Sequence, residues 1–156
     1  MICLVLLSTG LALSHLTNLA ACPLCIIQRM LYILIALLAL GAFITVWMFI
    51  EIQHTLCRLL ILLPIVLLAF VGAAVAGYQS WLQRFATDTV CGAELPWWEH
   101  LVYWAGDKIP WLFEASGLCA DPAWMFLGLS IAEWSILWFL LLAGIAIRMI
   151  FFSRLD

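Results

Sequence analysis

Long apolar runs, separated by shorter and more polar segments, set the pattern of this chain. Four runs reach the length of about 20 apolar residues that a helix needs to cross the bilayer core. They cover approximately residues 2–20, 26–50, 59–83 and 129–150 and contain almost no charged side chains. The pattern predicts an all-α membrane protein with four transmembrane helices in a single membrane domain, residues 1–156.

The longest segment between the runs, residues 84–128, differs from the short polar connection at 51–58. It holds most of the acidic residues, and its part from Pro96 to Phe113 is rich in tryptophan. Amphipathic aromatic rings prefer the headgroup level of a bilayer, so this part is predicted to form a short interfacial helix. A small packed lid over the bundle is the alternative. The predicted fold is therefore a four-helix transmembrane bundle with a Trp-rich loop that carries a short helix.

The composition agrees with a membrane protein and argues against other classes. Apolar residues make up 68% and charged residues 10% of the chain, compared with about 45–50% and about 25% in soluble domains. The six lysine and arginine residues are scattered along the chain, so we expect no nucleic acid partner. The expected surroundings are a lipid bilayer.

If four helices cross the membrane, successive connections between them lie on alternate faces. The six cysteines are then divided between the two faces. One face carries Cys22, Cys25, Cys91 and Cys119, whereas Cys3 and Cys57 fall on the opposite face. Basic residues are shared between the faces, so the positive-inside rule does not decide the orientation. Clustered cysteine pairs persist as disulfides in an oxidising compartment and not in cytosol. We therefore expect the four-cysteine face to be periplasmic and the other two cysteines to be bystanders.

The run Cys22-Pro23-Leu24-Cys25 near the start of the second apolar segment carries the strongest chemical signal. Two cysteines at this spacing can close a small disulfide ring, and Pro23 suits the first helical turn. Cys25 then lies near the positive end of the helix dipole, which favours a thiolate. Arg29 follows one turn later on the same face, and a charged residue inside a membrane segment is a functional candidate. Its expected partner is an anion, either the Cys25 thiolate or a reduced ligand beside it; snorkelling to the headgroups is the alternative.

Other interpretations of this motif are weaker. Zinc usually requires a second CxxC or a histidine pair at ligand spacing, so no metal is expected. Attachment of c-type haem requires histidine directly after the motif, where this chain has Ile26. A lipoprotein signal that ends at Cys22 would need basic residues before the apolar run, and the sequence shows none there.

Cys91 and Cys119 form a second pair on the predicted loop. A disulfide between them could act as a structural staple, worth about 3–4 kcal/mol in the chain-entropy model. Alternatively it is a mobile relay that exchanges with the first pair, because thiolate attack on a disulfide requires only contact. The residues alone leave both alternatives open.

The chain resembles the DsbB family, the quinone-dependent oxidases of periplasmic disulfide formation. The similarity rests on Cys22-Pro-Leu-Cys-Ile-Ile-Gln-Arg29, on His15, on the glycine and alanine stretch 72–77, and on residues 115–134. The family implies a thiol:quinone oxidoreductase of the bacterial inner membrane, with several passes and active cysteines that face the periplasm. It also implies a DsbA-like thioredoxin-fold partner and ubiquinone or menaquinone as the cofactor.

The resemblance further implies a role for each site residue. Cys91 would form the mixed disulfide with the partner, and Cys119 would pass the electrons to Cys22. Cys25 would be the thiolate that faces the quinone, and Arg29 would support the quinone and its developing charge. Cys25 and Arg29 are thus the expected quinone-binding residues.

Two departures from the family lie near these residues. Tyr78-Gln79 stands where many relatives carry a basic or histidine residue, so the resemblance carries no proton-handling role to this position. Leu118 stands where an acidic residue often precedes the second loop cysteine. Two rival functions stay open: a related thiol-redox protein with a dedicated partner or the reverse direction, and a structural membrane protein whose outer cysteines are staples.

Overall fold

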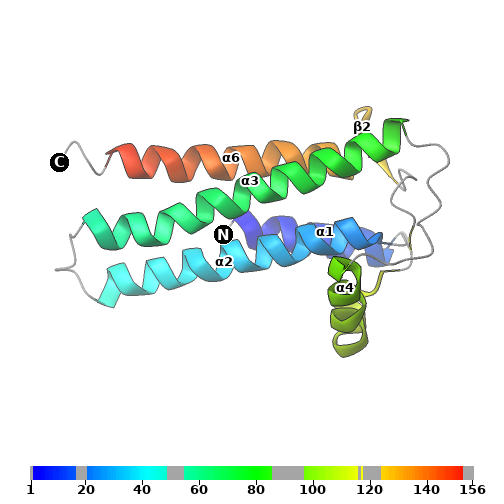
Figure 1. The fold of residues 1–156 in the computed structure, drawn as a ribbon, viewed down its shortest axis with the longest axis horizontal. Coiled ribbons are helices and arrows are strands. Elements are labelled where there is room, and N and C mark those ends of the chain that lie inside the picture. Colours follow the sequence, from blue (N-terminus) through cyan, green and yellow to red (C-terminus); the bar gives the residue numbers. More distant parts are fainter. Residues whose placement is uncertain are drawn as a thin grey trace.

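Helices of very different lengths make up nearly all of the described chain. The computed structural model describes residues 2–16, 21–48, 55–85, 97–115, 117 and 124–152. The elements are α1 (Ile2–Leu16), α2 (Pro23–Met48), α3 (Thr55–Phe85), α4 (Trp97–Lys108), α5 (Pro110–Phe113), β1 (Met125–Phe126), β2 (Leu129–Ser130) and α6 (Ile131–Phe152). The four longest helices run side by side, and α4 lies beside one end of α2, where it runs crosswise to the long helices and projects away from the bundle (Figure 1).

Three helices of the described chain are long and apolar enough to cross a membrane. They provide the segments Pro23–Ile44, Leu59–Phe85 and Ile131–Phe151. The described part of α1 is 15 residues long, and residues 17–20 of the first predicted span lie outside the described residues. The prediction of a helical membrane protein is confirmed, and the chain is a multi-pass membrane protein.

The centre of the bundle is organised around one phenylalanine. Phe139 of α6 is fully buried, and its ring stacks on that of Tyr32 of α2 with centroids 4.2 Å apart. On the other helix, a Cβ atom added to Gly72 of α3 would lie 2.4 Å from the Phe139 ring. Glycine is therefore required at position 72 for α3 to approach α6 this closely, as small residues often allow in membrane bundles.

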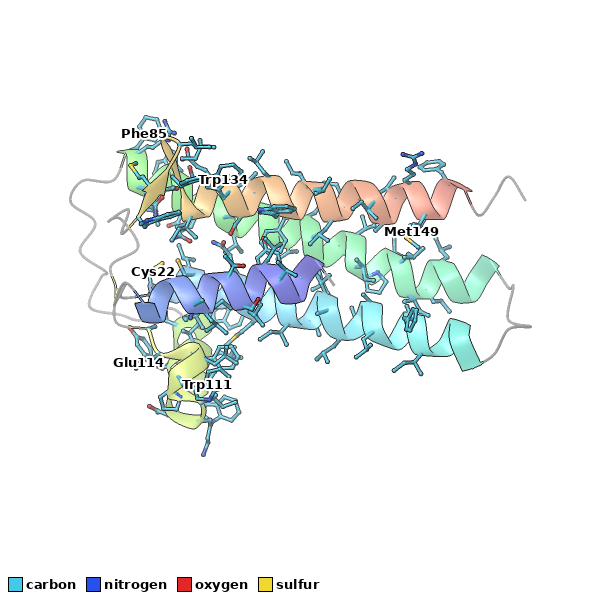
Figure 2. The ribbon with its side chains drawn as sticks, turned by 180° about the vertical axis from the view of Figure 1, so that it is seen from behind. Cys22, Phe85, Trp111, Glu114, Trp134 and Met149 are labelled. Carbon is cyan, nitrogen blue, oxygen red and sulfur yellow. The ribbon has the colours of Figure 1, made fainter. Side chains whose placement is uncertain are left out.

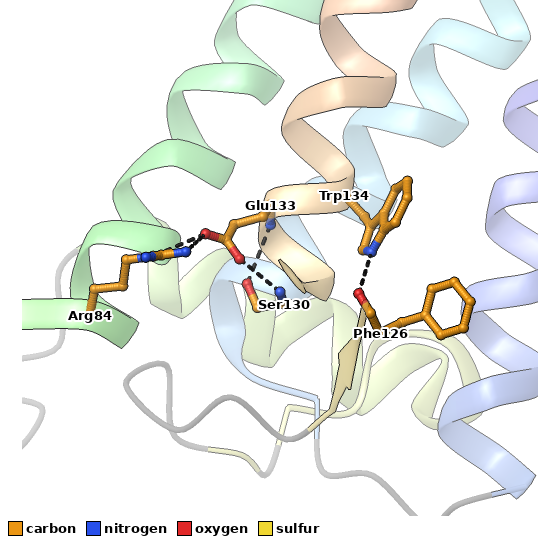
Figure 3. A network of polar contacts seen from close by, with 5 residues as sticks. All are labelled: Arg84, Phe126, Ser130, Glu133 and Trp134. Atoms are coloured by element: carbon orange, nitrogen blue, oxygen red, sulfur yellow. Dashed lines mark hydrogen bonds and ion pairs between the residues drawn. The ribbon is translucent and has the colours of Figure 1, made fainter. Parts of the chain in front are cut away.

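The start of α6 is capped by a reciprocal pair of hydrogen bonds (Figure 3). The backbone N–H of Ser130 donates to Glu133 Oε2 (2.8 Å), and the backbone N–H of Glu133 donates to Ser130 Oγ (3.4 Å). This Ser-x-x-Glu arrangement is a capping box, which satisfies orphan donors of the first helical turn. Arg84 near the end of α3 pairs with the same carboxylate through Nε (3.0 Å) and Nη2. The cap therefore also joins α3 to α6.

A short hairpin precedes this cap. Strands β1 and β2 pair antiparallel, with Met125 opposite Ser130. The two turn residues, Leu127 and Gly128, have positive φ angles of 54° and 78°, as expected for a two-residue turn that matches the strand twist. The indole N–H of Trp134 donates to the Phe126 carbonyl oxygen at 3.2 Å (Figure 3). This bond fixes the hairpin against the first turns of α6.

The short helix predicted in the Trp-rich loop is present as α4. Its inward face, which includes Val102 and Ala105, is buried, and α4 contacts α2. Its outward face carries the largely exposed rings of Trp97 and Trp104. The helix thus packs against α2 at one end of the bundle, and its exposed aromatic residues are suited to the headgroup level.

Candidate active site

The two cysteines of the CxxC motif lie at the first turn of α2. Pro23 begins the helix, in agreement with the preference of proline for the first helical position. The backbone N–H of Ile26 donates to the Cys22 carbonyl oxygen at 3.2 Å, and the backbone N–H of Cys25 donates to Cys22 Sγ at 3.4 Å. The Cys22 sulfur therefore occupies the place that a serine or aspartate oxygen takes in an N-cap.

These two residues, called here the α2 thiol pair, face each other at the start of the helix. Their Sγ atoms are 3.2 Å apart, with Cys22 as the donor of the hydrogen bond. Cys22 is buried, whereas Cys25 is partly exposed. Because a disulfide bond is about 2.05 Å long, the pair can close by a small rotation of the two side chains. Cys25 is the more accessible of the two sulfurs.

A buried glutamine of α3 reaches both sulfurs of the α2 thiol pair. Gln79 Nε2 donates to Cys25 Sγ at 3.1 Å and to Cys22 Sγ at 3.4 Å. Its Oε1 accepts a hydrogen bond of 2.8 Å from Gln28 Nε2, and both glutamine side chains are buried. Gln79 belongs to a departure from the family pattern and Gln28 to the motif around the cysteines, but neither was predicted to be a site residue. A polar side chain in an otherwise apolar membrane segment is the signal that could have found both.

Arg29 lies one helical turn after Cys25 and connects α2 with the loop helices. Its Nη1 donates to the carbonyl oxygen of Leu112 in α5 at 3.1 Å, and its side chain is partly buried. The guanidinium group is thus held against protein rather than extended freely toward the headgroups. This position keeps a positive charge beside the α2 thiol pair.

The loop after α5 also returns to the start of α2. The backbone N–H of Gly117 donates to the carbonyl oxygen of Ala21 at 2.9 Å, and Ala21 directly precedes Cys22. Figure 2 shows Cys22, Trp111 and Glu114 at the same end of the bundle, with Met149 at the opposite end. The two predicted loop cysteines, Cys91 and Cys119, lie outside the described residues.

The remaining cysteines have a different setting or lie outside the described side chains. Cys3 is a free thiol buried in the apolar core of the bundle beside Tyr32 and Ile35. The backbone of Cys57 belongs to α3, while its side chain lies outside the described residues. Two facing thiols, an amide donor and a guanidinium group at one end of a membrane bundle are suited to thiol–disulfide exchange with an electron acceptor from the lipid phase.

Comparisons with known proteins agree on one family. The family model for the disulfide bond formation protein DsbB matches residues 1–149. Disulfide bond formation protein B of Dechloromonas aromatica is 41% identical over 99% of this chain and 88% of its own length. The protein of the same name from Nitrosomonas europaea is 40% identical over 95% of this chain and 88% of its own length. That of Nitrosospira multiformis is 35% identical over 93% of this chain and 83% of its own length.

Proposed function

The chain belongs to the DsbB family and is a membrane thiol oxidoreductase of disulfide bond formation, and we propose that it oxidises a DsbA-like thioredoxin-fold dithiol with a membrane quinone as the final acceptor. The observation that carries this proposal is the α2 thiol pair, with its sulfur atoms 3.2 Å apart and Gln79 in contact with both. A structural staple would not need a side-chain N–H donor aimed at both of its sulfur atoms. The proposed site residues are Cys22, Cys25, Cys91 and Cys119, with Arg29 beside them.

Two successive exchanges carry the electrons through the protein. The partner dithiol reduces the Cys91–Cys119 disulfide and becomes a disulfide itself, so that two electrons pass to Cys91 and Cys119. The Cys119 thiolate then attacks Cys22 Sγ of the Cys22–Cys25 disulfide, and Cys25 leaves with the electron pair of the broken bond. Attack of Cys91 on Cys119 restores the Cys91–Cys119 disulfide and releases Cys22, which leaves the α2 thiol pair in its reduced form.

Chain connectivity supports the transfer from Cys119 to Cys22. Gly117 is hydrogen bonded to Ala21, and Cys119 follows Gly117 by two residues. Two extended residues span at most about 7 Å, so the length of chain after Gly117 is compatible with an exchange between Cys119 and Cys22.

The groups beside Cys25 fit an acceptor with carbonyl oxygens. Ubiquinone or menaquinone, when bound, would supply an acceptor for two electrons and two protons. Arg29 is the residue that would hold it, because a guanidinium group donates several hydrogen bonds and stabilises developing negative charge. Cys25, partly exposed next to it, is the sulfur that would donate the electrons.

The proposed location is the bacterial inner membrane, with the end of the bundle that carries Cys22 facing the periplasm. Disulfides persist in that compartment, where a soluble thioredoxin-fold partner can reach Cys91 and Cys119. The exposed Trp111 of α5 lies at the same end (Figure 2) and would rest at the headgroup level. Quinone dissolved in the lipid phase can then approach from the side.

The proposal is tested with the purified protein in lipid vesicles that contain quinone. Addition of a reduced thioredoxin-fold dithiol protein should produce quinol, followed by the loss of quinone absorbance. Cys25→Ser and Cys22→Ser should each abolish this reaction, whereas the matched control Cys57→Ser should retain it. Quinol production that continues at the parent rate in Cys25→Ser would remove the proposed function.

A further inference from the structure

The Gln79 side chain lies between the α2 thiol pair and a second glutamine. Its Nε2 contacts both sulfurs, at 3.1 Å and 3.4 Å, and its Oε1 accepts from Gln28 Nε2 at 2.8 Å. Gln28 is one turn after Cys25 on α2, while Gln79 belongs to α3. All contacts of this arrangement are buried or partly buried, where a directed hydrogen bond is stronger than in water.

The pairing with Gln28 determines which end of the Gln79 amide faces the sulfurs. A glutamine amide has one acceptor oxygen and one NH₂ group with two donors. Because Gln28 Nε2 donates to the oxygen, the NH₂ group of Gln79 points at the sulfurs. A thiolate can only accept hydrogen bonds, so this is the orientation that stabilises one.

We propose that Gln79 is a catalytic residue that stabilises the thiolate released when the disulfide of the α2 thiol pair is opened, and that Gln28 is a positioning residue that holds its amide in the productive orientation. The inference rests on the proposed function of the pair. When the incoming thiolate bonds to Cys22, the bond between the two sulfurs breaks and Cys25 receives the electron pair. The N–H donor at 3.1 Å from Cys25 Sγ is already in place for that charge, as in other preorganised anion sites.

Because the Gln79 amide is neutral, its stabilisation of the thiolate does not depend on its own protonation state. Glutamine does not titrate, so its N–H donation is the same at every pH at which the protein is folded. The second contact, to Cys22, lets the same NH₂ group serve either sulfur without moving. The site thus stabilises negative charge on the pair without a proton-transferring side chain at position 79.

A purely structural role for the two glutamines predicts a different result. Buried side-chain hydrogen bonds between membrane helices contribute to packing, and their loss would lower thermal stability without altering the redox equilibrium of the sulfurs. The reduction potential of the α2 thiol pair therefore separates the two roles. Stabilisation of the reduced pair raises this potential, so removal of the donor lowers it.

The test uses the full chain with Cys91 and Cys119 replaced by serine, so that glutathione equilibrates with the α2 thiol pair. Gln79→Leu should shift this equilibrium toward the disulfide by about tenfold, which equals about 30 mV for a two-electron couple. Gln83→Leu makes the same change one turn further along α3 and should leave the potential at the parent value. A parent potential in Gln79→Leu would overturn the inference.

Gln28→Leu keeps the inference testable where Gln79→Leu fails to fold. Leucine at position 28 removes the donor to Gln79 Oε1 without adding a charge, so the amide is no longer held with its NH₂ group toward the sulfurs. The potential should then fall, as it does in Gln79→Leu, while an unchanged potential would overturn the positioning role. Loss of quinol production in Cys25→Ser together with unaltered potentials in both glutamine variants would reject this inference and leave the proposed function standing.

Discussion

The centre of the bundle and its cysteine-bearing end hold neighbouring helices together by different means. At the centre, the rings of Phe139 and Tyr32 stack and Gly72 lies against the Phe139 ring, so the contact depends on shape. At the end, Gln79 joins α3 to α2 through hydrogen bonds to Gln28 and the α2 thiol pair. Lipid tails are as apolar as leucine, so helices in a membrane are not driven together by the hydrophobic effect and depend on packing and polar contacts.

We therefore expect the centre to determine the stability of the bundle and the cysteine-bearing end to determine the chemistry of the sulfur atoms. Loss of shape complementarity at the centre should loosen the bundle and leave the sulfur environment intact. Loss of a directed hydrogen bond at the end should alter the sulfur chemistry with a smaller effect on the bundle. The following changes test that separation, beginning with the largest expected effect.

Phe139→Ala should destabilise the protein most. Truncation of a fully buried phenylalanine leaves a cavity and typically costs about 3–5 kcal/mol. Thermal unfolding in detergent measures the loss, and Leu140→Ala, on the exposed side of the same helix, is the control with a small effect. The potential of the α2 thiol pair should match the parent value in both; a shift in Phe139→Ala would contradict the separation.

Gly72→Ala should destabilise the same contact from the opposite side. The added Cβ would lie 2.4 Å from the Phe139 ring, and overpacking of this kind costs about 1–3 kcal/mol. Gly77→Ala is the matched control, because nothing lies within 4 Å of its added Cβ and alanine favours a helix. In the Phe139→Ala background the cost of Gly72→Ala should largely vanish, and equal costs in both backgrounds would show that the clash is not with this ring.

Arg29→Met should weaken the use of quinone while the bundle stays folded. Loss of the guanidinium group should raise the quinone KM about tenfold, equal to about 1.4 kcal/mol. Arg148→Met, near the other end of the bundle, is the matched control. A quinone KM and rate equal to those of the parent in Arg29→Met would remove the proposed role of Arg29.

Glu133→Ala should have the smallest effect. It removes one half of the capping box of α6 and the partner of Arg84. Loss of a cap typically costs about 1 kcal/mol and an exposed ion pair adds little, so the free energy of unfolding should fall by about 1 kcal/mol. Arg84→Ala removes the ion pair and keeps the cap, and it should therefore cost less; the reverse order would show that the cap contributes little.

The features that could be predicted from the sequence are those set by local pattern. Apolar runs predicted a helical membrane protein, and the aromatic loop predicted the short helix α4; both predictions are confirmed. The position of Pro23 predicted the start of α2 beside the cysteines, which the structure also shows. The resemblance to the DsbB family is confirmed by the family model and the curated relatives.

The contacts between distant helices could not be predicted in this way. Gln28 and Gln79 are 51 residues apart, and a helix that is apolar on all sides gives no signal for which face meets its neighbour. The same limit applies to Gly72 and Phe139, whose fit depends on the rotation of α3 and α6. The roles of Cys91 and Cys119 stay predictions, because both residues lie outside the described part of the chain.

The most direct test asks whether the two cysteine pairs meet. In the variant Cys25→Ser/Cys91→Ser, Cys22 and Cys119 are the remaining members of the two proposed cysteine pairs. Mild oxidation followed by peptide mapping should yield one peptide pair linked through Cys22 and Cys119. Recovery of both cysteines as free thiols under conditions that oxidise the parent pairs would contradict the proposed electron path.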